Sequence, residues 1–477
     1  MKKAKIAIVG LGHYIYFNQF DGLREELMQK SEEFKEYLDP AICDVLDLGY
    51  VDCVEGAFDA VRSLKKEDAD LLFVIMSTYV PSAVCAPFAR YIDIPQVLVG
   101  IQPLEHLDYS HTTTYMQLCN DDICAMPEIA GVYERLGRKI PPCIVASSSQ
   151  SEKIKKQVSE WVAAATAMAG FKYETFGYLG HTYEGMYDMH TDPTAFTAAF
   201  GSHVKMLEMC ELARLSAAVT EDEIKEQIKE ITDTFEICDP SIDPLTDYVK
   251  NEDLEYSARQ AVALKKLVSN NKLTALAYYY KSEPNNPYEQ LAANLIIGNT
   301  LLTSFGIPLA GEADLKTAAA MLIMKNIGGG GSFAEIHPFD TADDVVLIGH
   351  DGPHNIAIAE GKPRLRKLKK YHGKSGSGIG VEFSLKAGPI TMLSINVDRN
   401  GKFRMIAAEG MSIAGDIPQT GNTNTRVSFG GDVCEFLASW CEVGPTHHLA
   451  LGVGHHMDTL RKFARISGIE LIEVKGK

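Results

Sequence analysis

The sequence predicts an α/β fold: two doubly wound parallel-sheet domains followed by a C-terminal antiparallel, β-barrel-like domain. Three observations lead to this prediction. Continuous apolar runs alternate with helix-length polar segments in the first third of the chain, and a second α/β pattern follows it. Short β-rich segments then dominate after the four-glycine run Gly328 to Gly331. We therefore expect domains at residues 1–172, 173–327 and 328–477.

Length and composition agree with this organisation. A chain of 477 residues exceeds what one hydrophobic core usually organises. With 63 acidic and 46 basic residues the net charge is -17, so we expect no nucleic-acid partner and no membrane association. The ten cysteines include no CxxC pair. This favours reduced, mostly buried thiols in a cytoplasmic enzyme.

The first domain is predicted from the apolar runs KIAIVGLG, DLLFVIMSTY and PQVLVGIQ. Uninterrupted apolar strands separated by helix-length segments are typical of a buried parallel sheet. The amino terminus imitates a signal peptide, but glycines and His13 break its short apolar stretch, so it is expected to be the first strand. Gly10-Leu11-Gly12 begins a dinucleotide fingerprint, yet Ile15 stands where the third glycine belongs. A plain strand-to-helix turn is the better interpretation.

The central domain is expected to begin with a strand near residue 173, after a helical stretch over residues 151–170. Thr220 and Glu223 have the spacing of a helix capping box, and apolar residues then recur at helical intervals from Ile224. KLTALAYYYK is predicted as a strand and NLIIGNTLLTSFG as a helix. In the last domain, Asn400-Gly401 lies between apolar runs and predicts a two-residue hairpin. A terminal helix, HMDTLRKFARISG, and a strand, IELIEV, close the chain.

Metal-competent side chains occur at four separate points near expected element ends: Glu312, Glu335, His350 and the pair His447–His448. Two carboxylates and two imidazoles at one point would bind a divalent cation suited to proton transfer on an oxygenated substrate. Each residue also has a structural explanation. An acid at position 312 would stabilise the first turn of a helix and would pair with Lys316.

The histidines leave alternatives open. His350 ends an apolar run, where a strand delivers a side chain to a sheet edge, and His354 in the same loop is a competing ligand. Successive strand residues point to opposite faces, so only one of His447 and His448 can be a ligand if that segment is extended. No nucleophile elbow or phosphate-binding lysine motif is present to suggest another chemistry.

The segments GEADLKTAAAMLIMK, SFAEI, VLIGH and GPTHH resemble, in this order, the L-arabinose isomerase family and the broader L-fucose and L-arabinose isomerase group. The resemblance covers most of the chain and is weaker in the first two domains. It implies an aldose–ketose isomerase whose cation, most often Mn²⁺ with Co²⁺ or Mg²⁺ as alternatives, is bound by Glu312, Glu335, His350 and His448. Glu312 and Glu335 would also be the catalytic proton carriers, and the two cannot be told apart by sequence.

The resemblance also implies a sugar substrate, a homo-oligomer built as a trimer or hexamer, and a set of substrate contacts. The expected contacts are His447, His13, Asn120, Met186, Asp188 and Tyr279. One departure concerns the N-terminal domain, where NDDICAMPEIAG has no histidine at the place expected for the family's active-site histidine. The identity of the sugar is therefore left open between an L-arabinose-like pentose and a 6-deoxyhexose.

Two other functions remain alternatives. A non-catalytic sugar-binding or regulatory protein would keep the same scaffold, although the four ligand positions argue against it. An NAD-dependent polyol oxidoreductase would need the complete phosphate-binding loop that Ile15 interrupts.

Overall fold

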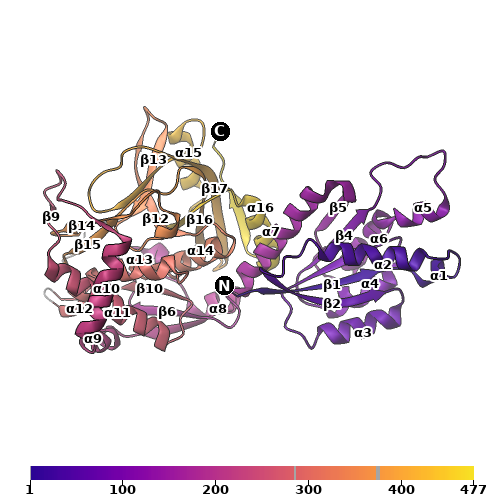
Figure 1. Ribbon diagram of the computed structural model, residues 1–477, viewed down its shortest axis with the longest axis horizontal. Helices are drawn as coiled ribbons and strands as arrows, with labels where there is room; N and C mark the ends of the chain where they lie inside the picture. Colours follow the sequence, from indigo (N-terminus) through magenta and orange to yellow (C-terminus); the bar gives the residue numbers. More distant parts are fainter. Residues whose placement is uncertain (1, 284–285, 372–375, 477) are drawn as a thin grey trace. The chain divides into compact units, whose positions relative to one another are not determined.

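The computed structural model describes residues 2–283, 286–371 and 376–476. The chain forms two compact units, Met1–Ala169 and Gly170–Lys477 (Figure 1). The boundary between them lies close to residue 172, where the sequence predicts the end of the N-terminal domain. The boundary predicted between residues 327 and 328 falls inside the second unit and stays a prediction.

The first unit is built on a parallel five-stranded sheet in the order β2-β1-β3-β4-β5. The predicted apolar runs form β1, β3 and β4, and every residue of β3 is buried. This order reverses at the β1–β3 neighbours, as in a doubly wound sheet, so the prediction is confirmed. The strands are β1 (Ala4–Leu11), β2 (Cys43–Val51), β3 (Leu71–Met76), β4 (Gln96–Gln102) and β5 (Cys143–Ser147).

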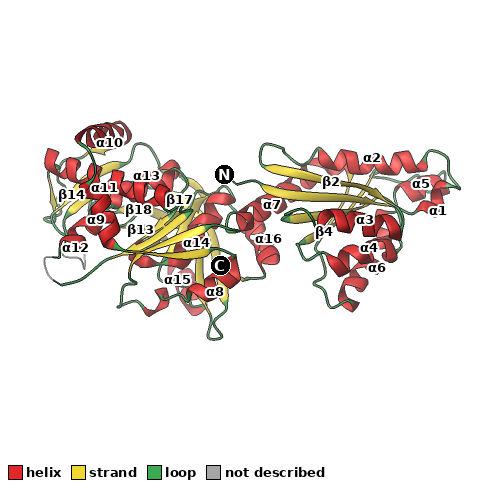
Figure 2. Cartoon of the chain, turned by 90° about the horizontal axis from the view of Figure 1, so that it is seen from below, coloured by secondary structure: helices red, strands yellow, loops and turns green. Residues whose placement is uncertain are grey.

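Helices cover both faces of this sheet. Figure 2 shows α2 on one side and α3, α4 and α6 on the other. The charged segment that forms α2 buries Leu23, Leu27 and Phe34 along one face, and the Phe34 ring packs 5.2 Å from that of Phe73. The helices are α2 (Leu23–Lys35), α3 (Val54–Leu64), α4 (Ser82–Tyr91), α6 (Asp122–Arg135) and α7 (Ser151–Ala169), with short α1 (Tyr14–Phe17) and α5 (Thr114–Cys119).

The second unit begins with another parallel sheet, in the order β11-β10-β6-β7. The predicted strand in KLTALAYYYK is β10, which is fully buried, and the predicted helix after it is α13. The strands are β6 (Thr175–Gly180), β7 (His203–Leu207), β10 (Ala275–Tyr279) and β11 (Leu309–Ala310). The helices are α8 (Pro193–Phe200), α9 (Met209–Ala217), α10 (Glu221–Thr234), α11 (Asn251–Asn270), α12 (Pro287–Ala293) and α13 (Ile296–Ser304).

Two features of this part bear on the predictions. The capping box is present, because the Thr220 side chain accepts from the Glu223 backbone while the Glu223 carboxylate accepts from the Thr220 backbone. Helix α14 (Leu315–Asn326) is buried almost all round, since it contacts β10 and β11 on one side and β12, β16 and β19 on the other. Such surroundings suit the apolar residues that make up most of this helix, and they also bury the polar side chains of Lys316 and Thr317.

The C-terminal part is the predicted antiparallel sheet. Its strands pair in the order β16-β19-β12-β13-β18-β17, and β16 also pairs with β17, so the antiparallel pairings form a closed cycle. A hairpin joins β16 to β17 at Asn400-Gly401 as predicted, with Gly401 at φ 77°, but its loop is longer than the two residues expected, because the last strand pair is Val397 with Phe403. The strands are β12 (Ser332–Asp340), β13 (Val345–His350), β16 (Gly388–Val397), β17 (Phe403–Ile413), β18 (Thr423–Ser428) and β19 (Leu449–Val453).

The last strand differs in direction. The predicted terminal helix is α16 (Met457–Ser467), and β20 (Glu470–Glu473) follows it and pairs in parallel with β17. The sheet is therefore mixed, because a helical connection returns the chain along the same direction. A smaller sheet is made of β8 (Glu236–Ile237), β9 (Thr246–Asp247), β14 (Arg364–Leu368) and β15 (Gly378–Glu382), and helix α15 (Val433–Glu442) precedes β19.

The surface corrects one expectation. Five of the ten free cysteines are exposed, namely Cys124, Cys143, Cys210, Cys434 and Cys441. The prediction of mostly buried thiols is thus wrong, since several lie on the solvent faces of helices.

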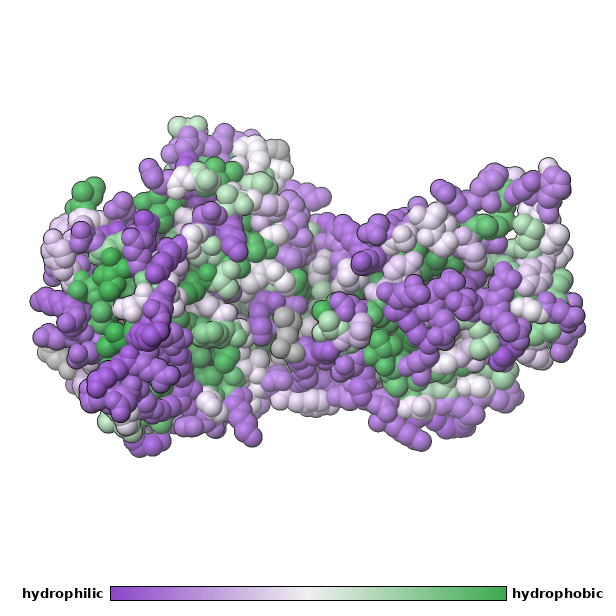
Figure 3. Space-filling view, viewed as in Figure 1, coloured by the Kyte–Doolittle hydropathy of each residue, from purple (hydrophilic) through white to green (hydrophobic). Residues whose placement is uncertain are grey.

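Hydrophilic residues spread over the visible face of both units, with apolar residues between them (Figure 3). Within the described ranges, no helix has the length and apolar composition needed to cross a bilayer.

Candidate metal centre

Glu312 lies on a strained turn between a strand and a helix. The 3₁₀ turn Gly311–Ala313 follows β11 directly, and α14 begins at Leu315. Glu312 and Ala313 both have left-handed backbone, with φ of 54° and 58°. This geometry costs a residue with a Cβ about 1–2 kcal/mol, and such strain concentrates at functional sites. The turn keeps Glu312 out of the helix and orients its carboxylate.

Neighbouring strands of the C-terminal sheet position the other predicted ligands. Glu335 of β12 stands opposite Gly349 of β13, directly before His350. β19 pairs with the other edge of β12 and begins at Leu449, directly after His448. Strand register therefore brings together residues that lie far apart in the sequence, because opposite residues of antiparallel strands are only about 4.5–5.5 Å apart.

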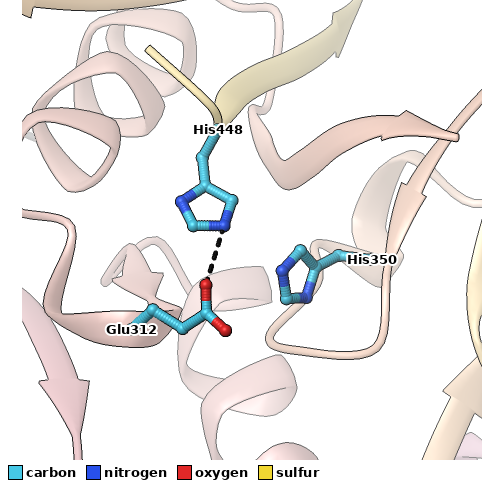
Figure 4. Close-up of side chains that lie close together, drawn as sticks. All are labelled: Glu312, His350 and His448. Carbon is cyan, nitrogen blue, oxygen red and sulfur yellow. Dashed lines mark ion pairs between the residues drawn. The ribbon is translucent and has the colours of Figure 1, made fainter. Parts of the chain in front are cut away.

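Glu312, His350 and His448 point toward one another (Figure 4). The Nε2 of His448 lies 3.1 Å from the Oε2 of Glu312, and the ligand atoms of the three residues all lie within 4.8 Å of one another. Glu335, His447 and His448 form a second group within the same limit. The Oε2 of Glu335 also lies 3.9 Å from the Nε2 of His350. All four predicted ligands are thus close together.

Glu335 accepts hydrogen bonds from two imidazoles. The Nε2 of His447 lies 2.7 Å from one carboxylate oxygen, and the Nε2 of His337 lies 3.0 Å from the other. Burial favours the neutral acid, but these bonds outweigh it and hold the pKa of Glu335 far below its usual range. The second nitrogen of His337 lies 2.6 Å from Oδ1 of Asn424. The carboxylate and this amide outweigh burial and raise the pKa of His337.

His448 is completely buried, and its Nδ1 lies 3.2 Å from the Oδ2 of Asp314. Burial lowers the pKa of the ring, but the carboxylates of Asp314 and Glu312 outweigh it and raise the pKa to about 9. Burial likewise disfavours charge on Asp314, yet Lys316 and His448 hold the pKa of Asp314 well below its usual range. Lys316 pairs with Asp314, at 3.4 Å, and not with Glu312 as the structural alternative from the sequence suggested.

His447 and His448 divide as an extended segment requires. The His447 side chain is 43% exposed and contacts Glu335, whereas His448 is buried against Glu312. Asp188 holds this segment, since its Oδ2 accepts from the His447 backbone at 2.7 Å and from the Thr446 hydroxyl at 2.8 Å. His447 also belongs to the group with Glu335 and His448, so its expected role as a substrate contact stays a prediction.

An open pocket of ≈ 580 Å³ adjoins the cluster. Of the expected substrate contacts, Met186 and Tyr279 line it, together with both glutamates and His350. Burial is the main cause that raises the pKa of Tyr279, so its hydroxyl keeps its proton. The remaining lining residues include Tyr183, His337, Pro338, Leu347, Asp351, Pro418, Thr420, Asn422 and Asn424. The pocket offers many hydrogen-bonding groups, which suits a polyhydroxylated ligand.

The competing histidine lies elsewhere. His354 is completely buried, and its ring packs edge-on against Phe383 with centroids 5.6 Å apart. Burial lowers the pKa of His354 to about 3, so the ring is neutral. His350, and not His354, lies with Glu312 and His448.

His13 and Asn120 belong to the first unit, and their role as substrate contacts stays a prediction. The His13 ring packs edge-on against Tyr16, with centroids 4.9 Å apart, and burial lowers the pKa of His13. The Asn120 side chain accepts from the Leu104 backbone at 2.9 Å.

Gly12 packs closely, since a Cβ there would lie 2.1 Å from the Tyr50 hydroxyl oxygen. Packing alone accounts for this glycine of the incomplete dinucleotide motif.

Sequence reasoning missed three residues around the cluster: His337, Asp314 and Lys316. His337 follows Glu335 by two residues, so the strand period of two placed it on the same face. Asp314 carried an N-cap signal, because it precedes the helix body KTAAAMLIMKN. Nothing in the local sequence signals a buried lysine at position 316, since its burial depends on two sheets that enclose α14.

The donor set fits a divalent cation. Carboxylate oxygens and imidazole nitrogens together bind Mn²⁺ and similar ions. The Asp314 carboxylate contacts the Nδ1 of His448, whereas Glu312 contacts the Nε2 on the other side of the ring. Histidines that bind metals commonly have such a carboxylate partner. The arrangement provides the parts of a metal centre in one place.

Two family models match adjoining segments. The L-arabinose isomerase central domain matches residues 181–330, and the L-arabinose isomerase C-terminal domain matches residues 330–470. L-arabinose isomerase 1 of Bacillus licheniformis is 23% identical over 465 residues, which cover 94% of this chain and 90% of that protein. L-arabinose isomerase of Actinobacillus succinogenes is 26% identical over 351 residues, which cover 71% of this chain and 68% of that protein. The chain belongs to the L-arabinose isomerase family of aldose–ketose isomerases.

Proposed function

We propose that the protein is a divalent-metal-dependent isomerase that interconverts an aldose and its ketose through an enediol. The substrate would be an L-arabinose-like pentose or a 6-deoxyhexose. The observation that carries this proposal is the convergence of Glu312, His350 and His448, with Glu335 beside them, at an open pocket. Membership of the family supports the same reaction class.

We infer that Glu312, Glu335, His350 and His448 bind the cation, with Mn²⁺ as the first expectation and Co²⁺ or Mg²⁺ as alternatives. The bound cation would supply Lewis-acid stabilisation of negative charge on the sugar oxygens. A cation also explains why two acids and two imidazoles lie in contact, since these groups are the ordinary oxygen and nitrogen ligands of such ions.

The reaction itself is a proton transfer between neighbouring carbons. One glutamate takes the proton from C2 of the open-chain aldose and returns it to C1, while the hydroxyl proton passes from O2 to O1. Glu312 and Glu335 both line the pocket, which supports either of them as the proton carrier.

The remaining substrate contacts are part of the proposal. His447 would hydrogen-bond a sugar hydroxyl, and Met186 and Tyr279 would form the pocket wall. Asp188 would contribute through the backbone of His447, which it already binds. His13 and Asn120 are also proposed as substrate contacts. We also propose a cytoplasmic homo-oligomer, a trimer or hexamer, which light scattering on the purified protein would measure.

The test is to remove bound metal with a chelator, restore Mn²⁺, Co²⁺ or Mg²⁺ separately, and assay ketose formation. The panel should contain the aldopentoses and the 6-deoxyhexoses. We expect no turnover without metal and recovery with Mn²⁺. Sugar binding without turnover in every metal would instead indicate the non-catalytic sugar-binding protein.

A further inference from the structure

A buried lysine and a buried aspartate lie behind His448. The side chains of Lys316 and Asp314 are both 0% exposed, and the Lys316 Nζ lies 3.4 Å from Oδ1 of Asp314. The other carboxylate oxygen of Asp314 lies 3.2 Å from Nδ1 of His448. The far nitrogen of that ring lies 3.1 Å from Glu312. The four residues form one chain of contacts that leads from inside the protein into the cluster.

The Asp314 carboxylate is held in a single orientation. Its Oδ1 accepts from the backbone N–H groups of Lys316 and Thr317, each at 3.1 Å, which are the N-cap bonds of α14. Its Oδ2 accepts from the Thr317 hydroxyl at 2.8 Å. The position of Asp314 is therefore tied to the start of a helix enclosed by two sheets, and the His448 ring takes its orientation from that fixed point.

Lys316 needs an explanation beyond packing. A charged ammonium without access to water costs several kcal/mol unless it is paired, and a well-packed apolar residue is often at least as stabilising as a buried ion pair. The Nζ of Lys316 contacts Asp314 and the Thr191 hydroxyl, the latter at 3.4 Å. Its charge is thus directed at the carboxylate that contacts the Nδ1 of His448.

We propose that Asp314 and Lys316 are positioning residues for His448. Asp314 accepts a hydrogen bond from Nδ1, which leaves the opposite nitrogen to face the cluster, and Lys316 holds the carboxylate in place by its charge. This inference rests on the proposed function, because a cation is the partner that the far nitrogen would bind. Removal of such a carboxylate partner typically weakens metal binding about 10–100-fold.

The first variant is Asp314→Asn. Asn has nearly the same size and caps helices about as well as Asp, so α14 keeps its N-cap while the charge beside Nδ1 is lost. We expect the Kd for Mn²⁺, measured by calorimetry on metal-stripped protein without sugar, to rise about 10–100-fold. The d–d absorption spectrum of the Co²⁺-loaded protein should also shift. An unchanged Kd and spectrum in the folded variant would overturn the proposal.

The second variant is Lys316→Met, and the first unit offers its matched control. Lys30 and Asp122 form another buried pair, 2.8 Å apart, with side chains 8% and 2% exposed. Lys316→Met and Lys30→Met each leave one buried carboxylate without its lysine, so both should lower thermal stability. Only Lys316→Met should raise the Kd for Mn²⁺, by about 10-fold or more. Equal Mn²⁺ affinities in the two variants would contradict the inference.

Folding is checked by a cooperative thermal transition. If Asp314→Asn does not fold, Thr317→Val takes its place, because it removes only the hydroxyl that binds Asp314 at 2.8 Å. A Kd within twofold of the native value would then refute the positioning role. Failure of the proposed function is distinct: the native protein would bind no Mn²⁺ or form no ketose. If the native protein forms ketose and the variants keep the native Kd for Mn²⁺, only the positioning role is refuted.

Discussion

Glu312 and Glu335 approach the same point from different surroundings. Glu335 accepts hydrogen bonds from His337 and His447, whereas Glu312 lies against the buried His448 on a left-handed turn. Both carboxylates line the open pocket. At the residue scale, imidazoles and backbone strain therefore set the geometry of these two acids.

Replacing either acid with its amide tests its proposed role in the reaction. Glu312→Gln and Glu335→Gln each keep the side-chain shape but lose the negative charge and the proton-carrying group. We expect kcat to fall by about 10²–10⁴-fold or more in each variant, with an unchanged circular dichroism spectrum. Ketose formation in single-substrate assays is the measurement. A variant that retains nearly the native rate would exclude that glutamate from the mechanism.

The two competing histidines give a matched pair of variants. His350→Ala removes a ring that lies with Glu312 and His448, so the purified protein should contain no stoichiometric metal. His354→Ala removes a completely buried ring that packs on Phe383, so it should keep the metal and lose about 1–3 kcal/mol of stability. Elemental analysis and denaturant unfolding measure the two effects. The reverse pattern of metal content would show that His354 is the ligand.

Metal affinity should depend on pH through His448. Its pKa is raised from 6.5 to about 9, so in the metal-free protein the ring carries a proton at neutral pH. A cation must displace that proton, and affinity should therefore rise with pH until about 9, by up to about tenfold per unit. The charged ring stabilises the metal-free fold below pH 6.5, and this contribution is lost as pH rises toward 9. Mn²⁺ titrations at several pH values test the direction, and a pH-independent Kd would contradict it.

At the scale of elements, the register of neighbouring strands brings the residues of the cluster together. β12 lies between β13 and β19, and its Glu335 meets the ends of both neighbours where His350 and His448 stand. A shift of one residue in any of these strands would turn its ligand to the opposite face. Helix α14 adds the fixed start at Asp314, so two sheets and one helix cooperate in placing the ligands.

Helix α10 provides a test of element stability away from the cluster. The capping box of Thr220 and Glu223 satisfies backbone groups at its start. Thr220→Ala should lower the free energy of unfolding by about 1 kcal/mol while leaving kcat unchanged, because neither residue lines the pocket. Denaturant unfolding monitored by circular dichroism measures the loss. A large drop in turnover would mean that α10 is coupled to the site.

At the scale of the whole molecule, the predicted ligands all belong to the second unit. Mn²⁺ at 100 times its Kd should stabilise that unit by about 2.7 kcal/mol, which raises its melting temperature. If calorimetry resolves two transitions, only one should move with metal. The His448→Ala protein should show no shift, and a shift of both transitions would indicate that the units unfold together.

The sequence by itself determined the main fold elements and singled out the residues proposed here as ligands. Uninterrupted apolar runs predicted the buried parallel strands, and the capping box predicted α10, because these signals arise within a few neighbouring residues. Four short segments in a given order also predicted Glu312, Glu335, His350 and His448 as a group, through their resemblance to a family. Local signals failed for the exposed cysteines and for the direction of β20, since both depend on which face meets solvent or another strand.

Only the tertiary structure decided how these residues meet. Because β12 pairs with β13 and β19, His350 and not His354 lies beside Glu335. His447 is left partly exposed, whereas His448 is buried against Glu312. The tertiary structure also enclosed Lys316 beside Asp314, far from water. The physical reason is that burial and contact between distant segments depend on sheet register and on the packing of α14, which no stretch of neighbouring residues encodes.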